Sequence, residues 1–288
     1  MLEMRELPVF WGCRAIAGDV AFELSVRALA EELGIRLLDL RGQACCGEPL
    51  RSVSLPASCY LAIRPLALAA REGHGLLFVP CPKGFYMMSW SLDLLSRSKE
   101  LREQVSKALE AEGLDLSRLA EPVDLMCMLV ELSDIEELSE MAGRGLGLRV
   151  AIHPGCYMLR SKRGAYVRLW ELRTVLEAVG IEAPYYPGLM DCCGGSLELT
   201  RPDAALTLAG SKLQAASGAG LECILVLCPS CFNMLDGRQE DALAAVGAKE
   251  RVPVLYLPQA LGLALGLSDG KLGLDFYRSP VDELRTKP

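Results

Sequence analysis

The sequence predicts an α/β fold with two lobes related by a pseudo-twofold axis, each built on a parallel-type sheet. Short apolar runs alternate with stretches of helical periodicity, which is the pattern of parallel sheets covered by helices. Cysteines also recur in two sets at nearly constant separation, since Cys13 and Cys156 lie 143 positions apart and Cys45 and Cys192 lie 147 apart. A repeat of this length predicts two related domains rather than a solenoid.

The first half, residues 1–145, alternates predicted strands with predicted helices. A helix is expected where Phe22, Val26 and Leu29 recur at helical spacing, and Gly34 follows as its C-terminal cap. The other predicted elements are strands at 7–12, 35–40 and 76–80, a helix at 56–72, and mostly helical connections at 84–112 and 125–141.

The second half, residues 146–288, repeats this order. Strands are expected at 149–153 and 223–227, with a short segment at 181–186 in the place of the second strand. Helices are expected around Leu172, with Gly180 as the cap, and at 203–217. Ligands of parallel sheets bind in loops beyond the carboxyl ends of the strands, and every cysteine of the two sets falls in such a loop. We therefore expect the functional site at that edge.

Five second-half cysteines follow the pattern C-x35-CC-x34-C-x-x-C. The turn from Cys228 to Cys231 sets two soft thiolate ligands within reach of one metal centre. Cys156, Cys192 and Cys193 bring the number to five, one more than a zinc ion or a cubane cluster requires. Adjacent side chains in extended backbone point apart, so the pair can address different irons. Zinc held by four of the thiolates, or cysteines packed as small apolar groups, remain alternatives.

The first half carries an incomplete copy of this pattern. Cys13, Cys45, Cys46 and Cys81 repeat four of the positions, but Gly84 stands where the second cysteine of the C-x-x-C turn would be. Four thiolates can hold zinc, an ordinary cluster, or a modified cluster with an open iron. Loss of function in this half is an equal alternative.

One histidine and three further cysteines complete the set of candidate residues. His153 lies three residues before Cys156 at a strand end, where a proton donor for a leaving thiolate is needed, although core packing also explains it. Cys59, Cys127 and Cys223 lie outside the repeat and are expected to be buried core residues.

Composition excludes several classes of function. A net charge of −7 disfavours nucleic-acid partners. Because charged residues interrupt the first apolar runs and no run reaches about 20 residues, we expect neither secretion nor a membrane span, and a cytoplasmic location. Twelve cysteines in a reducing compartment predict metal ligation or thiol chemistry rather than disulfides. No glycine-rich dinucleotide loop is present, so flavin or nicotinamide belongs to another subunit.

The cysteine pattern resembles the cysteine-rich CCG-domain family, and within it the B subunit of heterodisulfide reductase, including the variant found in sulfur oxidisers. The resemblance covers almost the whole chain, including the closing segments 255–259 and 263–267. It implies an oxidoreductase that acts on sulfur groups at a non-cubane [4Fe-4S] cluster. By this resemblance the cluster ligands are Cys156, Cys192, Cys193, Cys228 and Cys231.

The resemblance also implies partners and leaves one rival function. It implies a complex with a ferredoxin-like C subunit, together with a flavoprotein A subunit, that is active on a thiol, disulfide or sulfane-sulfur substrate. The first half could then hold a second cluster or zinc. The rival is a non-catalytic electron-relay or zinc-containing assembly subunit of a complex that oxidises succinate, lactate or glycolate, where CCG domains also occur.

Overall fold

The computed structural model describes residues 5–132, 134–143, 146–160, 165–276 and 281–284 of the 288-residue chain. It divides into two compact units, the first formed by Met1–Gly18 with Ala30–Leu132 and the second by Asp19–Leu29 with Ser133–Pro288. Each unit contains a parallel sheet, which confirms the predicted α/β class. The predicted domain boundary at residue 145 lies outside the described residues.

The sheet of the first unit has four parallel strands in the order β2-β1-β3-β4. Three of them match the predicted strands, whereas β4 was not predicted: it contains Pro122 and, unlike the equally short β3, leads to no cysteine motif. The strands are β1 (Arg5–Val9), β2 (Ile35–Asp39), β3 (Leu76–Phe78) and β4 (Glu121–Val123).

Helices pack against this sheet around one apolar core. Ile63 of α3, Met87 of α4 and Leu109 of α5 are fully buried in it together with Leu77 of β3. The start of α3 is fixed by Ser54, whose hydroxyl accepts a hydrogen bond from the Ala57 amide at 3.4 Å. The helices of this unit are α1 (Cys13–Gly18), α3 (Leu55–Arg71), α4 (Pro82–Arg97), α5 (Lys99–Glu110) and α6 (Leu125–Cys127).

The sheet of the second unit repeats the same strand order with one strand reduced. It runs β5-β6-β7, and Arg149 and Glu182 form an isolated parallel bridge where the first unit has a complete strand. Pro184 and Pro187 follow that bridge and have no N–H to continue a ladder. The strands are β5 (Val150–His153), β6 (Cys223–Val226) and β7 (Val254–Tyr256), and every residue in them is buried.

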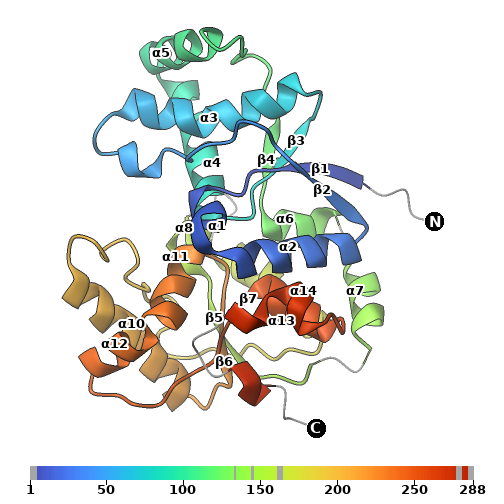
Figure 1. The fold of residues 1–288 in the computed structure, drawn as a ribbon, viewed down its shortest axis with the longest axis vertical. Helices are drawn as coiled ribbons and strands as arrows, with labels where there is room; N and C mark the ends of the chain where they lie inside the picture. Colours follow the sequence, from blue (N-terminus) through green and yellow to red (C-terminus); the bar gives the residue numbers. More distant parts are fainter. Residues whose placement is uncertain (1–4, 133, 144–145, 161–164, 277–280, 285–288) are drawn as a thin grey trace. The chain divides into compact units, whose positions relative to one another are not determined.

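Helix α2 (Val20–Glu32) comes from the first half of the sequence, but its residues up to Leu29 belong to the second unit. The Phe22 ring lies 4.9 Å from the Tyr256 ring, and the Tyr256 hydroxyl hydrogen-bonds the Asp19 carboxylate. Figure 1 shows this helix in blue beside α13 and α14 in red.

The other helices of the second unit surround its sheet, and none of the described helices is both long and apolar enough to cross a membrane. They are α7 (Ile135–Ala142), α8 (Gly155–Leu159), α9 (Ala165–Ala178), α10 (Pro202–Gly218), α11 (Pro229–Phe232), α12 (Gln239–Ala245), α13 (Leu257–Ala264) and α14 (Asp269–Leu272).

Candidate metal centre

Three second-half cysteines follow the carboxyl ends of β5 and β6, and Cys192 and Cys193 lie in the loop that follows the isolated bridge at Glu182. Cys156 is in α8, directly after β5, and Cys228 caps the start of α11, directly after β6, with Cys231 one turn later. Gly155 has φ 74°, and a Cβ there would lie 3.6 Å from the Cys231 sulfur. The positive φ favours glycine at this position, and the contact shows that the start of α8 packs against the C-x-x-C turn.

Two of these thiols and His153 form a buried group. The Sγ atoms of Cys193 and Cys231 lie 3.2 Å apart, and both are free thiols. Their sulfurs and a ring nitrogen of His153 all lie within 4.8 Å of one another. His153 is only 2% exposed, and neither of its ring nitrogens has a hydrogen-bond partner among the described residues. A buried polar group without a partner is costly, so the arrangement fits a ligand that supplies one.

The adjacent cysteines differ in exposure, although their side chains hydrogen-bond each other. Cys193 is buried, whereas Cys192 is exposed and its sulfur accepts a hydrogen bond from the Gly194 amide at 3.3 Å. The pair therefore presents one sulfur to the buried group and one to solvent.

All five second-half thiols act on one another electrostatically. Hydrogen bonds from Cys192 and Cys231 lower the pKa of Cys193, and the same bonds raise the pKa of each donor. The pKa of Cys156 is raised by burial and then by the charges of Cys228 and Cys193. Ionising one thiol thus opposes ionisation of the others, and a bound cation would relieve this opposition.

The backbone beside each cysteine pair repeats between the halves. Gly194 has φ 79°, and a Cβ there would lie 2.4 Å from the carbonyl oxygen of Ala205 in α10. Gly47 has φ 81°, and its Cβ would lie 2.3 Å from the carbonyl oxygen of Ser58 in α3. Both pairs of positions are 147 residues apart. The duplication seen in the sequence is therefore also a duplication of a close loop-to-helix contact that requires glycine.

Lys212 of α10 is a site residue that the sequence reasoning missed. Its side chain is fully buried, and its ammonium donates to the carbonyl of Gly188 at 2.5 Å, to the Tyr186 hydroxyl at 3.3 Å and to the carbonyl of Leu189 at 3.4 Å. These acceptors lie in the loop that leads to Cys192. The only signal in the sequence was a lysine at helical spacing among the small apolar residues of α10.

The four first-half cysteines also gather after strands, but they are more open. Cys13 is exposed, Cys45 and Cys81 are half-buried, and Cys46 is buried. A hydrogen bond from Cys46 lowers the pKa of Cys45 to about 6 and raises that of Cys46, while burial raises the pKa of Cys13. Among the residues that the structure describes, these cysteines form no compact group of three ligands like that of the second half.

Phe10 and Gly84 occupy the first-half positions that correspond to His153 and Cys231, at separations of 143 and 147 residues. A Cβ on Gly84 would lie 3.1 Å from Cγ1 of Val79 and 3.6 Å from the Phe10 ring. A cysteine at this position would therefore be in tight contact with Val79 and in ordinary contact with Phe10. The first half does not fit a group that requires five thiolates.

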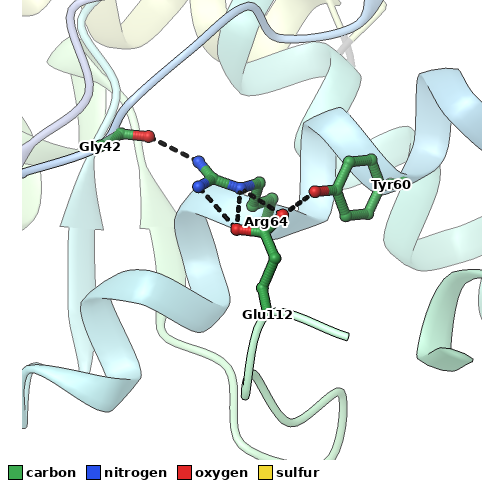
Figure 2. A network of polar contacts seen from close by, with 4 residues as sticks. All are labelled: Gly42, Tyr60, Arg64 and Glu112. Atoms are coloured by element: carbon green, nitrogen blue, oxygen red, sulfur yellow. Dashed lines mark hydrogen bonds and ion pairs between the residues drawn. The ribbon is translucent and has the colours of Figure 1, made fainter. Parts of the chain in front are cut away.

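A basic side chain holds the loop before Cys45 as well. Arg64 of α3 donates to the carbonyl of Gly42, at 2.5 Å, and to both carboxylate oxygens of Glu112. Figure 2 shows these contacts. Tyr60 donates to the same carboxylate. Arg64 thus resembles Lys212 in binding a carbonyl upstream of the cysteine pair, but its charge is paired with a carboxylate.

The three cysteines outside the repeat are buried, as expected. Cys59 and Cys223 have no exposed surface and Cys127 is 8% exposed. Burial raises the pKa of Cys223 to about 12, which keeps it a neutral thiol.

Comparisons with known proteins identify the repeated segments. The family model of the CCG cysteine-rich domain matches residues 8–89 and 150–236, which contain all nine cysteines of the two sets. The heterodisulfide reductase B-subunit-like protein of Archaeoglobus profundus is 30% identical over 96% of this chain and 95% of that protein. The B subunit of the ferredoxin/F420H2-dependent CoB-CoM heterodisulfide reductase of Methanosarcina acetivorans is 27% identical over 94% of this chain and 93% of its own length.

A relative from another kind of enzyme and one solved structure are also similar. The membrane anchor subunit of the 8-methylmenaquinol:fumarate reductase of Wolinella succinogenes is 28% identical over 94% of this chain and 96% of that subunit. The crystal structure of a hypothetical protein from Helicobacter pylori has a TM-score of 0.74 at 15% identity, and the match covers 95% of this chain and 52% of that one. The structural likeness supports the fold.

Proposed function

Because this chain belongs to the cysteine-rich CCG-domain family and is similar to the B subunit of heterodisulfide reductase, we propose that it is the iron-sulfur subunit of a heterodisulfide reductase-like complex. In this proposal the second half exchanges electrons with a disulfide or sulfane-sulfur substrate. The observation that carries it is the buried approach of Cys193 and Cys231 to 3.2 Å without a disulfide, beside a histidine with no hydrogen-bond partner among the described residues.

The proposed ligands fit a non-cubane [4Fe-4S] cluster by number and by chemistry. Soft thiolates are the preferred ligands of iron-sulfur clusters, and the mutual opposition of these thiols to ionisation favours a cation among them. When bound, such a cluster supplies one-electron exchange and an iron that can bind sulfur. The proposed ligands are Cys156, Cys192, Cys193, Cys228 and Cys231.

Other side chains position and open this site. Cys192 is the exposed ligand, so we place the approach of a substrate sulfur on its side. Burial lowers the pKa of His153 and so disfavours the charged form that a proton donor needs. We therefore assign His153 the task of donating a hydrogen bond from its neutral ring to the Cys193 or Cys231 sulfur. Such a bond would satisfy one of its two unpartnered nitrogens.

For the first half we propose a different occupant. Gly84 stands in the fifth cysteine position, beside Phe10 and Val79, which leaves Cys13, Cys45, Cys46 and Cys81 as ligands for zinc or for a four-thiolate cluster. No disulfide chemistry is assigned to the first half.

The proposed partners are the ferredoxin-like C subunit, together with the flavoprotein A subunit, of a heterodisulfide reductase-like complex. The support for them is that relatives over the whole chain are named as subunits of such reductases. Electrons would then pass between these partners and the thiolate-bound centre of the second half.

A second candidate is an electron-relay subunit of a fumarate- or succinate-type complex. It is favoured by the similarity to the fumarate reductase subunit of Wolinella succinogenes and by the incomplete first-half pattern. Affinity purification of the tagged chain from its natural host separates the two candidates. Recovery of a heterodisulfide-type flavoprotein with a ferredoxin-like protein supports the first, and recovery of a dicarboxylate dehydrogenase flavoprotein supports the second.

The decisive experiment measures iron, acid-labile sulfide and zinc in the anaerobically purified full chain, with EPR after oxidation with and without thiol. We expect about four irons in the second half and a thiol-sensitive signal. Cys193→Ser should lose both, because it removes the sulfur that touches Cys231.

Cys223→Ala is the matched control, since Cys223 is a buried cysteine of the same unit outside the site. It should keep the iron and the signal. Zinc alone in the wild type, reproduced in cluster-competent expression, would overturn the proposal, as would iron retained in full by Cys193→Ser.

A further inference from the structure

Lys212 is a buried ammonium whose hydrogen bonds all go to neutral groups. Its three acceptors are the carbonyls of Gly188 and Leu189 and the hydroxyl of Tyr186, over whose ring the nitrogen also lies at 5.6 Å from the centroid. Among the described residues no carboxylate comes within ion-pair distance of it. The donors are satisfied, but the ammonium forms no close ion pair with a carboxylate, and burying a charge without such a pair is costly.

Asp191 and three of the site cysteines are the anionic groups that act on Lys212, and Asp191 acts most strongly. Burial lowers the pKa of Lys212 to about 8, and the charges of Asp191, Cys231, Cys193 and Cys192 act in the opposite direction. Three of these four groups are proposed ligands of the second half. Ionised thiolates would therefore stabilise the ammonium, and the ammonium would stabilise them in return.

We infer that Lys212 is the built-in countercharge of the second-half thiolates and the anchor of the loop that carries Cys192 and Cys193. This inference rests on the proposed function, because it assigns the lysine to the group held there. The ammonium fixes the loop through Gly188 and Leu189, and its charge favours an electron-rich metal centre. Lys212 is a positioning residue, since it reaches the metal only through the cysteines.

In the first half, the basic side chain that binds the loop before the cysteine pair has its charge paired with a carboxylate. Arg64 binds the carbonyl of Gly42 upstream of its cysteine pair, but Glu112 neutralises it through both carboxylate oxygens (Figure 2). The position that corresponds to Lys212 in the repeat is Pro65, which carries no charge. At this place in the repeat the first half thus has a loop anchor whose charge is paired with a carboxylate.

The test compares the one-electron reduction potential of the iron-loaded full chain with that of Lys212→Met, followed by EPR. Removing a nearby positive charge disfavours the reduced, more negative state. We expect the equilibrium constant for reduction to fall about tenfold, a shift of about 59 mV to lower potential. Lys212→Arg should restore the potential, and Arg64→Met, the first-half counterpart, should leave the second-half signal in place. A variant that had only lost structure would bind less cluster, but the potential of the remaining cluster would not fall in Lys212→Met and recover in Lys212→Arg.

A second measurement uses cobalt(II) and the metal-free full chain, so that it does not depend on an iron-sulfur cluster. Thiolate-to-cobalt absorption should show at least tenfold weaker binding for Lys212→Met and near wild-type binding for Lys212→Arg. If the wild type holds no cluster but cobalt binding still weakens, the proposed function fails and the role of Lys212 stands. If potential and cobalt affinity are both unchanged in Lys212→Met, the inference is wrong. Should Lys212→Met not fold, Lys212→Gln keeps a donor for the loop, and the same two readouts decide.

Discussion

Cys223 links a single buried thiol to the alkaline stability of the protein. It lies in β6 with no exposed surface, and burial raises its pKa to about 12. A group whose pKa is raised on folding stabilises the fold fully below its unfolded pKa and loses that contribution as the pH rises towards the folded value. Its stabilising contribution therefore declines above about pH 9.

We predict that Cys223→Ala removes this pH dependence. The difference in unfolding free energy between wild type and variant should be constant near neutral pH and shrink by about 1.5 kcal/mol between pH 8 and pH 10. Urea unfolding of the metal-free, reduced chains at several pH values measures it. A difference that stays constant to pH 10 would show that Cys223 ionises as readily in the folded protein as in the unfolded one.

At the residue scale, the sequence identified candidates whose signal is local. The cysteines could be found because they recur at nearly constant spacing, most of them directly after a strand. Lys212 could not, because its acceptors lie 23 to 26 residues earlier in a loop without regular structure. The sequence showed that Gly84 replaces Cys231, but not that Phe10 packs beside it. That contact joins two segments that are distant in the sequence and depends on the fold.

At the element scale, Gly194 joins the cysteine-pair loop to α10. Any other residue there would need a left-handed backbone conformation, and its Cβ would lie 2.4 Å from the Ala205 carbonyl oxygen. Gly220 also has a positive φ, 66°, but nothing lies within 4 Å of its would-be Cβ. The two glycines therefore differ in crowding but share the backbone conformation.

We predict that Gly194→Ala lowers the unfolding free energy by about 3 kcal/mol and Gly220→Ala by about 1 kcal/mol. Chemical denaturation of the metal-free chains measures both changes. Gly47→Ala should behave like Gly194→Ala, because its Cβ would meet the Ser58 carbonyl at 2.3 Å. Equal losses for Gly194→Ala and Gly220→Ala would mean that the loop yields without cost.

Elements with a clear period or a following cysteine motif were predicted, including the three-residue strand β3, whereas β4 and β7 were not. The strands before Cys13, Cys45 and Cys81 and the helices α2 and α3 follow the expected pattern. The strands β4 and β7 have three residues each and carry no readable period. The apolar segment 257–264 forms helix α13. It directly follows β7, so one apolar run in the sequence contains both a strand and a helix.

At the scale of the whole molecule, the compact units do not follow the two copies of the repeat. Residues Asp19–Leu29 belong to the second unit, where Gly273 packs so closely on α2 that a Cβ would lie 2.8 Å from the Cα of Ala21. The periodicity of α2 predicted a helix but contained no information about which sheet it covers.

We predict that Phe22→Ala weakens the second unit by about 3–5 kcal/mol, because the ring is fully buried against Tyr256. Hydrogen exchange should become faster in β7 and α13. Val105→Ala in α5 is the control, and its faster exchange should fall in the first unit. Equal effects of Phe22→Ala on both units would show that they unfold as one.

Most of α2 lies in the first copy of the repeat but belongs to the second unit, so the two copies cannot be separated without dividing that unit. A gene cut at the repeat boundary would deliver a second half without the segment that covers Tyr256 and Gly273, and its partner fragment would carry that segment with nothing to cover. The two fragments would then need each other, so the protein is suited to split-fragment complementation, with recovery of the thiol site reporting that the pieces have met.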